Sequence, residues 1–233
     1  MIKNLKKKVV VAMSGGVDSS LAVALLKEEG YDVLGITIHH YDGNESLESA
    51  EQAAQNLEIP WHVLDFTKEF KSIVINYFCN EYLTGRTPNP CVICNLKIKF
   101  GLLWDKAKSL GADYLATGHY AINEYAQKSK KFLLKRGVDE SKDQSYFLYR
   151  LNQDILPYIL FPLGKFKKKH SREKAKKYGL ENYKKAESQE ICFIQDDNYR
   201  KFLTQHIKNT VKPGKFIDKE GKILGDHQGI PFY

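Results

Sequence analysis

The sequence lacks the features that mark secreted and membrane proteins. Its 233 residues include four cysteines, too few for the disulfide framework that stabilises small secreted domains. No apolar stretch approaches the length of a membrane span, and residues 1–8 lack the apolar core of a signal peptide. Internal repeats and low-complexity linkers are absent as well. These absences predict a cytoplasmic globular protein with no membrane partner.

The two commonest phosphate-binding motifs are also missing. The chain contains neither the Gly-x4-Gly-Lys-Ser/Thr of a P-loop nor the Gly-x-Gly-x-x-Gly of a Rossmann fingerprint. It does contain Ser14-Gly15-Gly16-Val17-Asp18-Ser19, placed between an apolar, β-branched run at 9–13 and an apolar helix pattern that starts at Leu21 and ends near Gly30. Glycines and hydroxyls where a strand meets a helix can aim backbone NH groups at a phosphate. This segment therefore predicts an anion site.

The hexapeptide resembles the PP-loop of the ATP pyrophosphatases. That resemblance implies that the loop holds the β and γ phosphates of ATP while the α phosphate is attacked and pyrophosphate leaves. Asp18 would then serve Mg²⁺ or pyrophosphate, and Ser14 and Ser19 would bind phosphate oxygens. The alternative is a plain strand-to-helix turn in which Asp18 and the serines only cap a helix.

The first half of the chain alternates strand and helix patterns. This order predicts an α/β fold: a mostly parallel sheet with helices on both faces, and ligands at the carboxyl ends of the strands. Ser14 to Ser19, Ile38 and Gly118 lie at such ends. The further strands are expected at 33–38, 61–65 and 113–117, and the helices at 45–57, 70–83 and 96–110.

The character of the sequence changes after Pro162. Short helical patterns at 171–177 and 198–206 replace the strand and helix alternation. We expect a PP-loop domain at 1–163 and a small, mainly helical second domain at 164–233.

Basic residues outnumber acidic ones, and the formal net charge is +8. Lysines are densest between Lys165 and Lys185, where Phe166, Tyr178 and Tyr183 are interleaved with them. Such runs are usually solvated faces, but aromatic residues among the charges are typical of nucleic-acid surfaces. RNA is therefore a candidate partner.

Three of the cysteines lie in segments that suggest chemistry. Cys91 and Cys94 form a CxxC within 85–95, GRTPNPCVICN, just before an expected helix whose macrodipole favours thiolates. Cys192 lies in EICFI, and Cys79 lies in an apolar helix pattern that predicts a core position.

Five segments in this order resemble the bacterial tRNA-specific 2-thiouridylases, the MnmA/TrmU family. They are SGGVDS (14–19), GRTPNPCVICN (85–95), ATGHY (116–120), DESKDQSYFL (139–148) and EICFI (190–194). The resemblance implies ATP-dependent 2-thiolation of the wobble uridine of tRNA, with ATP and Mg²⁺ as cofactors. The partners would be tRNA and a sulfur donor, either a persulfide-carrying protein or sulfide.

The resemblance also implies roles for individual residues. Cys94 would be the nucleophile and Cys192 would carry the persulfide sulfur, with Asp18 as the third catalytic residue. The ATP contacts would be Ala12, Met13, Ser14, Gly15, Gly16, Val17, Asp18, Ser19, Ile38 and Gly118. The residues against the target base would be Asn89, Pro90 and Cys91, and those contacting tRNA would be Lys142, Asp143 and Gln144.

The chemistry explains why such groups occur together. ATP adenylates the C2 oxygen of uridine, AMP then departs with that oxygen, and a soft sulfur nucleophile attacks C2. Cys94 could reduce the Cys192 persulfide to sulfide or act on the ring itself, which leaves a Cys94–Cys192 disulfide. The wobble base must be splayed into the pocket for this attack.

Cys91 departs from the family pattern, because many members carry Asp at this position. Cys91, Cys94 and Cys192 could therefore hold a 4Fe-4S cluster by three thiolates, which leaves one iron open for sulfide. The cluster and the cysteine-persulfide route are alternatives, and zinc is the structural alternative. A metal site at His39, His40 and His119 is a weaker interpretation than polar wall residues, and His119 is the histidine we expect to have a function.

In the family, residues 226–233 continue into a glycine-rich turn and a C-terminal β-barrel. We expect the barrel to be absent, either in a shortened form or in a naturally reduced member. The competing functions are a PP-loop enzyme that adenylates a small molecule, which would not need Cys94 and Cys192, and an RNA-binding or sulfur-carrier protein without turnover.

Overall fold

A five-stranded parallel sheet forms the centre of the protein in the computed structural model, which describes residues 6–41, 45–180, 191–194, 198–207 and 211–233. The order of the strands across the sheet is β3-β2-β1-β4-β7. This arrangement confirms the predicted α/β fold class. The strands are β1 (Lys8–Ala12), β2 (Asp32–His39), β3 (Trp61–Asp65), β4 (Tyr114–Thr117) and β7 (Ile159–Leu160).

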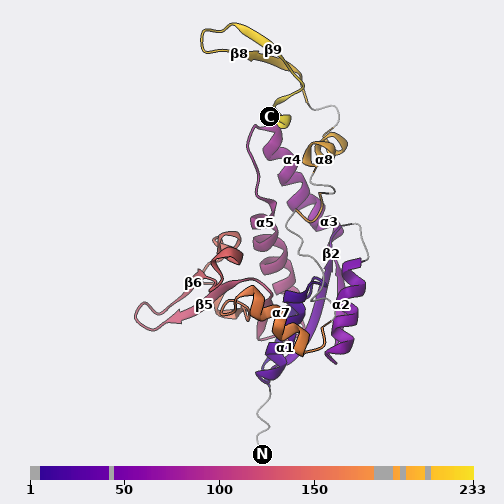
Figure 1. The fold of residues 1–233 in the computed structure, drawn as a ribbon, viewed down its shortest axis with the longest axis vertical. Coiled ribbons are helices and arrows are strands. Elements are labelled where there is room, and N and C mark those ends of the chain that lie inside the picture. The colour runs from indigo at the N-terminus through magenta and orange to yellow at the C-terminus, as the bar shows by residue number, and fades with distance from the viewer. Residues whose placement is uncertain (1–5, 42–44, 181–190, 195–197, 208–210) are drawn as a thin grey trace, which may run out of the picture.

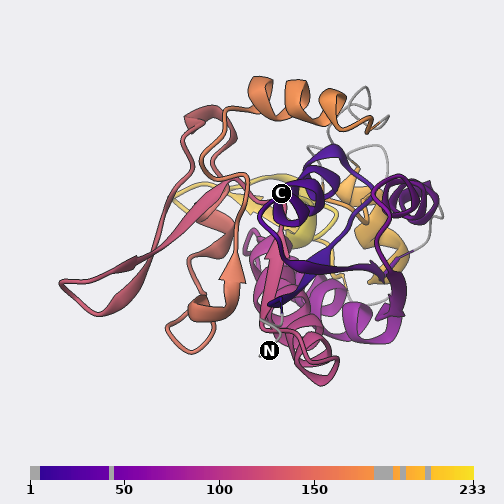
Figure 2. The same cartoon turned by 90° about the horizontal axis from the view of Figure 1, so that it is seen from below.

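Helices cover both faces of this sheet (Figures 1 and 2). Alternate residues of a strand point to opposite faces, so Val9 and Val11 pack with α1 (Val17–Glu28) and α2 (Glu45–Asn56). Val10 packs on the other face, with side chains of a long helix that ends at Ser109. The middle of β1 is therefore fully buried, as its apolar, β-branched run predicted.

Two long helices carry π-helical segments. The first consists of α3 (Thr67–Phe70), η1 (Lys71–Ile75) and α4 (Asn76–Leu83). The second consists of α5 (Pro90–Ile93), η2 (Cys94–Leu103) and α6 (Trp104–Ser109). This second helix begins earlier than the expected position 96, because the Asn89 side chain caps it and Pro90 supplies a helical φ at the first turn. The CxxC cysteines consequently lie inside the helix.

Two antiparallel hairpins were not predicted. They are β5 (Ala121–Ala126) with β6 (Lys131–Arg136), and β8 (Gly214–Ile217) with β9 (Ile223–His227). The second hairpin lies at the end of the molecule opposite the N-terminus (Figure 1). Residues after 163 are thus not only helical. Short 3-10 helices are η3 (Glu140–Lys142), η4 (Ser145–Leu148), η5 (Leu156–Tyr158) and η8 (Ile230–Phe232).

The helices expected after 163 are present as α7 (Lys168–Lys177) and α8 (Tyr199–His206). α7 packs against α1, and Ala175 and Leu180 share a core cluster with Val9. The division into domains at 163 and 164 stays a prediction.

A separate aromatic cluster anchors the segment that carries Cys192. The ring of Phe193 lies 5.7 Å from Phe70, 5.3 Å from Phe78 and 5.1 Å from Phe202, measured between ring centres. Cys79 is buried in the same cluster, as predicted, and burial raises its pKa to about 11. The packing of Phe193 against the first long helix therefore fixes the position of the neighbouring Cys192.

Within the described residues, no helix combines the length and the apolar character that a membrane span requires.

We expect Phe193→Ala to lower the free energy of unfolding by about 3–5 kcal/mol, because the fully packed ring leaves a cavity. The control is Phe216→Ala, since Phe216 is 41% exposed on β8 and its removal should change stability by about 0.5 kcal/mol or less. Urea unfolding followed by circular dichroism measures both. Equal effects of the two substitutions would contradict the assignment of Phe193 to the core.

Candidate active site

The loop at 14–16 owes its shape to glycine and to serine hydroxyls. Gly15 has φ +74°, and a Cβ atom there would collide with the backbone oxygen of Ser46 at the start of α2. The NH of Ser14 donates to Ser19 Oγ at 3.1 Å, and Ser19 Oγ donates to the carbonyl of Gly16 at 2.9 Å. Gly16 is the N-cap of α1, so no side chain at that position caps the helix. The start of α1 and the loop can therefore receive an anion.

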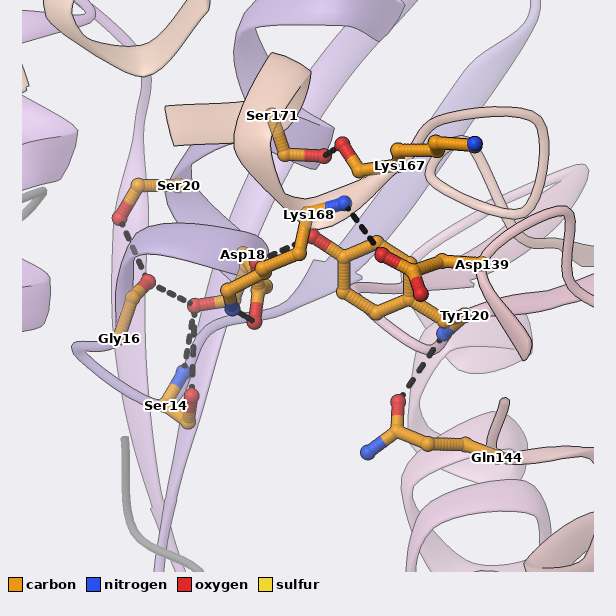
Figure 3. A network of polar contacts seen from close by, with 11 residues as sticks. Ser14, Gly16, Asp18, Ser20, Tyr120, Asp139, Gln144, Lys167, Lys168 and Ser171 are labelled. Carbon is orange, nitrogen blue, oxygen red and sulfur yellow. Dashed lines mark hydrogen bonds and ion pairs between the residues drawn. The ribbon is translucent and has the colours of Figure 1, made fainter. Parts of the chain in front are cut away.

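Asp18 does not cap the helix; it is the centre of a polar network (Figure 3). Tyr120 Oη donates to Asp18 Oδ1 at 2.9 Å, and Lys168 Nζ forms an ion pair with Asp18 Oδ2 at 2.6 Å. The Lys168 ammonium also lies 5.4 Å from the centre of the Tyr120 ring. Capping by Asp18, the alternative derived from the sequence, is therefore wrong.

The expected ATP contacts lie together at the carboxyl edge of the sheet. Ala12 is the last residue of β1, and Met13 follows it. Ile38 lies near the end of β2 and Gly118 follows β4, and both β2 and β4 are neighbours of β1 in the sheet. A Cβ atom on Gly118 would lie 2.8 Å from the Ser19 nitrogen. Only glycine permits this approach of the segment after β4 to the start of α1. Parallel topology thus assembles residues that are distant in sequence.

The residues expected to contact tRNA are partly engaged within the chain. Gln144 Oε1 accepts from the NH of Tyr120 at 3.0 Å, and the NH of Gln144 donates to the Tyr120 carbonyl at 2.9 Å. Asp143 accepts from the NH of Gly137 at 2.9 Å and from the Ser145 hydroxyl at 2.8 Å. Burial raises the pKa of Asp143, but these hydrogen bonds outweigh it and hold the pKa below its usual value.

The two Gln144 bonds fasten the segment around 139–148 to Tyr120, which also donates to Asp18. Lys142, which ends η3, is half-buried. A role of Lys142, Asp143 and Gln144 toward tRNA stays a prediction.

The three cysteines of interest come together beside this edge. Cys91 and Cys94 lie in the same helix, and Cys192 approaches it from a distant segment. Cys192 is exposed, but the surrounding protein atoms desolvate its thiol and Cys94 and Cys91 lie near it, which together raise its pKa to about 12. All three are free thiols in the structure. Tertiary packing has therefore assembled the thiols that the sequence only suggested.

The expectation that the helix start favours thiolates is wrong. Burial raises the pKa of both Cys91 and Cys94 above the ordinary value of a thiol. The nearby cation is Lys99, which acts in the opposite direction and lowers the pKa of all three thiols.

Lys99 was missed in the sequence because its proximity to Cys94 depends on the π-helical register of η2. Hydrogen bonds in a π-helix span five residues, so positions five apart lie on similar sides of the helix. Lys99 is half-buried between Ile98 and Phe100, which are both buried. No sequence pattern indicates such a register.

His40 lies between the thiols and the carboxyl edge of the sheet. Its Nδ1 lies 3.0 Å from the carbonyl of Ile38, and its Nε2 lies 3.5 Å from Cys192 Sγ. Burial lowers the pKa of His40, which favours the neutral ring. A neutral ring that donates from Nδ1 to Ile38 presents the lone pair of Nε2 to Cys192 and can accept the proton of its thiol.

The other histidines have separate surroundings. His119 is near Thr117, with 2.7 Å between Nδ1 and Oγ1, and burial lowers its pKa well below the usual value. His39 Nδ1 lies 3.9 Å from Asp65 Oδ1. Within the described ranges, no group of three or more His, Cys, Asp or Glu side chains is arranged to hold a metal ion. A 4Fe-4S cluster or a zinc ion held by Cys91, Cys94 and Cys192 stays a prediction.

Asn89 and Pro90 form the start of the second long helix. Asn89 Oδ1 accepts from the NH of Val92 at 3.3 Å, and Pro90 is buried. Cys91 follows directly and is half-buried. Contact of these three residues with a target base stays a prediction.

Solved structures with a similar fold include two enzymes. A 4-thiouridine synthetase in complex with RNA and bound ATP has a TM-score of 0.57 and 17% identity, covering 88% of this chain and 51% of that one. NMN synthetase from Francisella tularensis has a TM-score of 0.51 and 13% identity, covering 94% of this chain and 81% of that one. At these identities the comparison shows a shared fold.

Sequence comparisons give the family. Residues 7–196 match the model of the tRNA methyl transferase HUP domain. The tRNA-specific 2-thiouridylase MnmA of Carboxydothermus hydrogenoformans is 50% identical over 98% of this chain, and MnmA 2 of a Thermoanaerobacter species is 49% identical over 98%. The chain spans 66% of the length of the first relative and 67% of the second. This protein belongs to the tRNA-specific 2-thiouridylase family, with a HUP domain of PP-loop type.

Proposed function

We propose that the protein uses ATP and Mg²⁺ in the cytoplasm to replace the C2 oxygen of the wobble uridine of tRNA with sulfur. One observation carries the proposal: His40 contacts both Cys192 and the carbonyl of Ile38, so the thiols adjoin the edge that carries the phosphate loop. A small-molecule adenylating enzyme would have no use for thiols at this position. Membership of the family supports the same reaction.

The phosphate loop would serve the adenylation half of the reaction. Backbone NH groups at the start of α1, with Ser14 and Ser19, would hold the β and γ phosphates. Asp18, which accepts from Lys168 in this structure, is the carboxylate that would hold Mg²⁺, and the metal would offset phosphate charge. The C2 oxygen of uridine attacks the α phosphorus, and pyrophosphate leaves. Gly118 keeps the segment after β4 close to the loop during this step.

The thiols would serve the sulfur-transfer half. A persulfide-carrying protein delivers one sulfur atom to Cys192 and leaves as a thiol. Cys94 then attacks Sγ of Cys192, which forms the Cys94–Cys192 disulfide and releases sulfide. The two thiols are oxidised to the disulfide while the transferred sulfur is reduced to sulfide. Two equivalents of a cellular thiol then reduce the disulfide, are themselves oxidised, and restore Cys94 and Cys192 as thiols. Sulfide attacks C2, and AMP departs with the oxygen.

An alternative for Cys94 is attack on the uridine ring itself. Cys94 would displace AMP from C2, and the outer sulfur of the Cys192 persulfide would then displace Cys94. The freed Cys94 would attack Sγ of Cys192, which breaks the S–S bond, leaves the outer sulfur on C2 and forms the same disulfide. Neither route passes through a metal cluster, and a 4Fe-4S cluster held by Cys91, Cys94 and Cys192 is the alternative that would deliver sulfide instead. His40 would accept the proton of Cys192 in both routes.

Transfer RNA would bind with its wobble base near the start of α5. Asn89, Pro90 and Cys91 would lie against the splayed base, and Lys142, Asp143 and Gln144 would contact the RNA. The net charge of +8 supports binding of a polyanion.

We expect Cys192→Ser, Cys94→Ser and Asp18→Ala to abolish 2-thiouridine formation. The full-length protein is incubated with ATP, Mg²⁺, a protein persulfide and tRNA, and the digested RNA is examined by mass spectrometry. Cys79→Ala is the control, because Cys79 lies in the aromatic cluster and should affect stability but not product. Normal product from Cys192→Ser would contradict the assigned sulfur role.

The second prediction concerns pH. Since the pKa of Cys192 is raised to about 12, its thiol is protonated at neutral pH, and alkylation should speed up about tenfold per pH unit from 7 to 9. Lys99→Met removes a cation that lowers this pKa, so alkylation of Cys192 at a fixed pH should slow further.

Alkylation by iodoacetamide, with each cysteine followed by mass spectrometry, measures this effect. Lys97→Met is the matched control, because Lys97 is exposed on the same helix. If Lys99→Met and Lys97→Met react at the same rate as the unmodified protein, Lys99 does not act on the thiols.

A further inference from the structure

Lys168 stands out among the many lysines because it is buried. Its side chain is 10% exposed, while Lys167 and Lys169 on either side of it are exposed. An ammonium group is costly to bury unless a charged partner accompanies it. That partner is Asp18 of the phosphate loop, which lies 150 positions earlier in the chain. A residue from α7 therefore reaches the start of α1.

Several contacts determine where the ammonium of Lys168 lies. The backbone NH of Lys168 donates to Asp139 Oδ2 at 2.8 Å, which fixes the first turn of α7 (Figure 3). Farther along α7, Ala175 packs in the core with side chains of α1. The position of Nζ is thus set by the docking of a whole helix.

Binding of Mg²⁺ and nucleotide would compete with the ion pair between Asp18 and Lys168. Both oxygens of Asp18 accept bonds from protein donors, one from Tyr120 and one from Lys168. Mg²⁺ requires a carboxylate oxygen, and the phosphates of ATP bring further negative charge to the same helix end. A lysine has three donors on a flexible stem, so it can exchange one anionic partner for another.

We propose that Lys168 is a ligand of the β and γ phosphates of ATP, held by Asp18 until nucleotide arrives. When Mg²⁺ and ATP bind, the ammonium moves to the phosphates and Asp18 is released to the metal. This inference rests on the ATP site of the proposed function and assigns to that site a residue from outside the phosphate loop.

The test compares ligands with and without the outer phosphates. Binding of Mg²⁺-pyrophosphate, of α,β-methylene ATP and of AMP is measured by calorimetry on the unmodified protein and on Lys168→Met and Lys168→Gln. Glutamine keeps a donor toward Asp18 and preserves folding if methionine does not. Lys169→Met, one residue further on the same helix, is the control.

We expect affinity for pyrophosphate and for the ATP analogue to fall about tenfold or more in the Lys168 variants, because a charge-assisted hydrogen bond to phosphate is lost. Affinity for AMP, and all affinities of Lys169→Met, should stay unchanged. If Lys168 had a purely structural role, the affinity for AMP would fall in parallel with the affinity for pyrophosphate, and that result would overturn the inference. Unchanged pyrophosphate affinity would overturn it as well.

A double-mutant cycle tests the exchange of partners. Without Mg²⁺, Asp18→Asn should tighten pyrophosphate binding, since Lys168 is no longer held, and the gain should shrink in the Lys168→Gln background. If Asp18→Asn raised the affinity for pyrophosphate equally with Lys168 and with Lys168→Gln, the two residues would act independently, and the exchange of partners would be overturned. Failure of the unmodified protein to bind any of the ligands would instead overturn the ATP site of the proposed function.

Discussion

The carboxylate of Asp18 ties together three segments that the rest of the site depends on. It accepts from Tyr120 after β4 and from Lys168 at the start of α7, and it belongs to the first turn of α1. A buried ammonium is stable only beside such a charge, so the docking of α7 and the shape of the phosphate loop are linked. The link extends through the backbone of Tyr120 to Gln144. The ion pair between Asp18 and Lys168 therefore organises the carboxyl edge of the sheet around the loop at 14–16.

A second constraint, aromatic packing, determines where Cys192 lies. Phe193 is inserted among rings of the first long helix and α8, and it carries Cys192 with it. The resulting burial makes the thiols weaker acids than free cysteine. Lys99 counteracts this by its charge, and His40 Nε2 lies 3.5 Å from Cys192 Sγ. The residues that desolvate the thiols and the cation that lowers their pKa thus come from different parts of the chain.

The sheet could be predicted because its strands are buried. The run at 9–13 is apolar and β-branched, and residues of β1 are inaccessible on both faces. The β5–β6 hairpin escaped prediction because it is largely exposed, and its strands Ala121–Ala126 and Lys131–Arg136 carry charged residues that weaken any alternation. The same is true of β8 and β9, which leave Ile217 and Leu224 in solvent. Exposed hairpins are specified by backbone pairing, which leaves little trace in composition.

The sequence by itself determined the α/β class, the phosphate loop with its two glycines, and the identity of the thiols, because each depends on local spacing or on the kinds of residue present. Only the tertiary structure decided which groups act on them. Lys168 reaches Asp18 through the packing of α7 on α1, and Lys99 reaches Cys94 through a π-helical register. The direction of the thiol pKa shift was decided in the same way, since the burial that raises the pKa of Cys91 and Cys94 exists only in the folded chain.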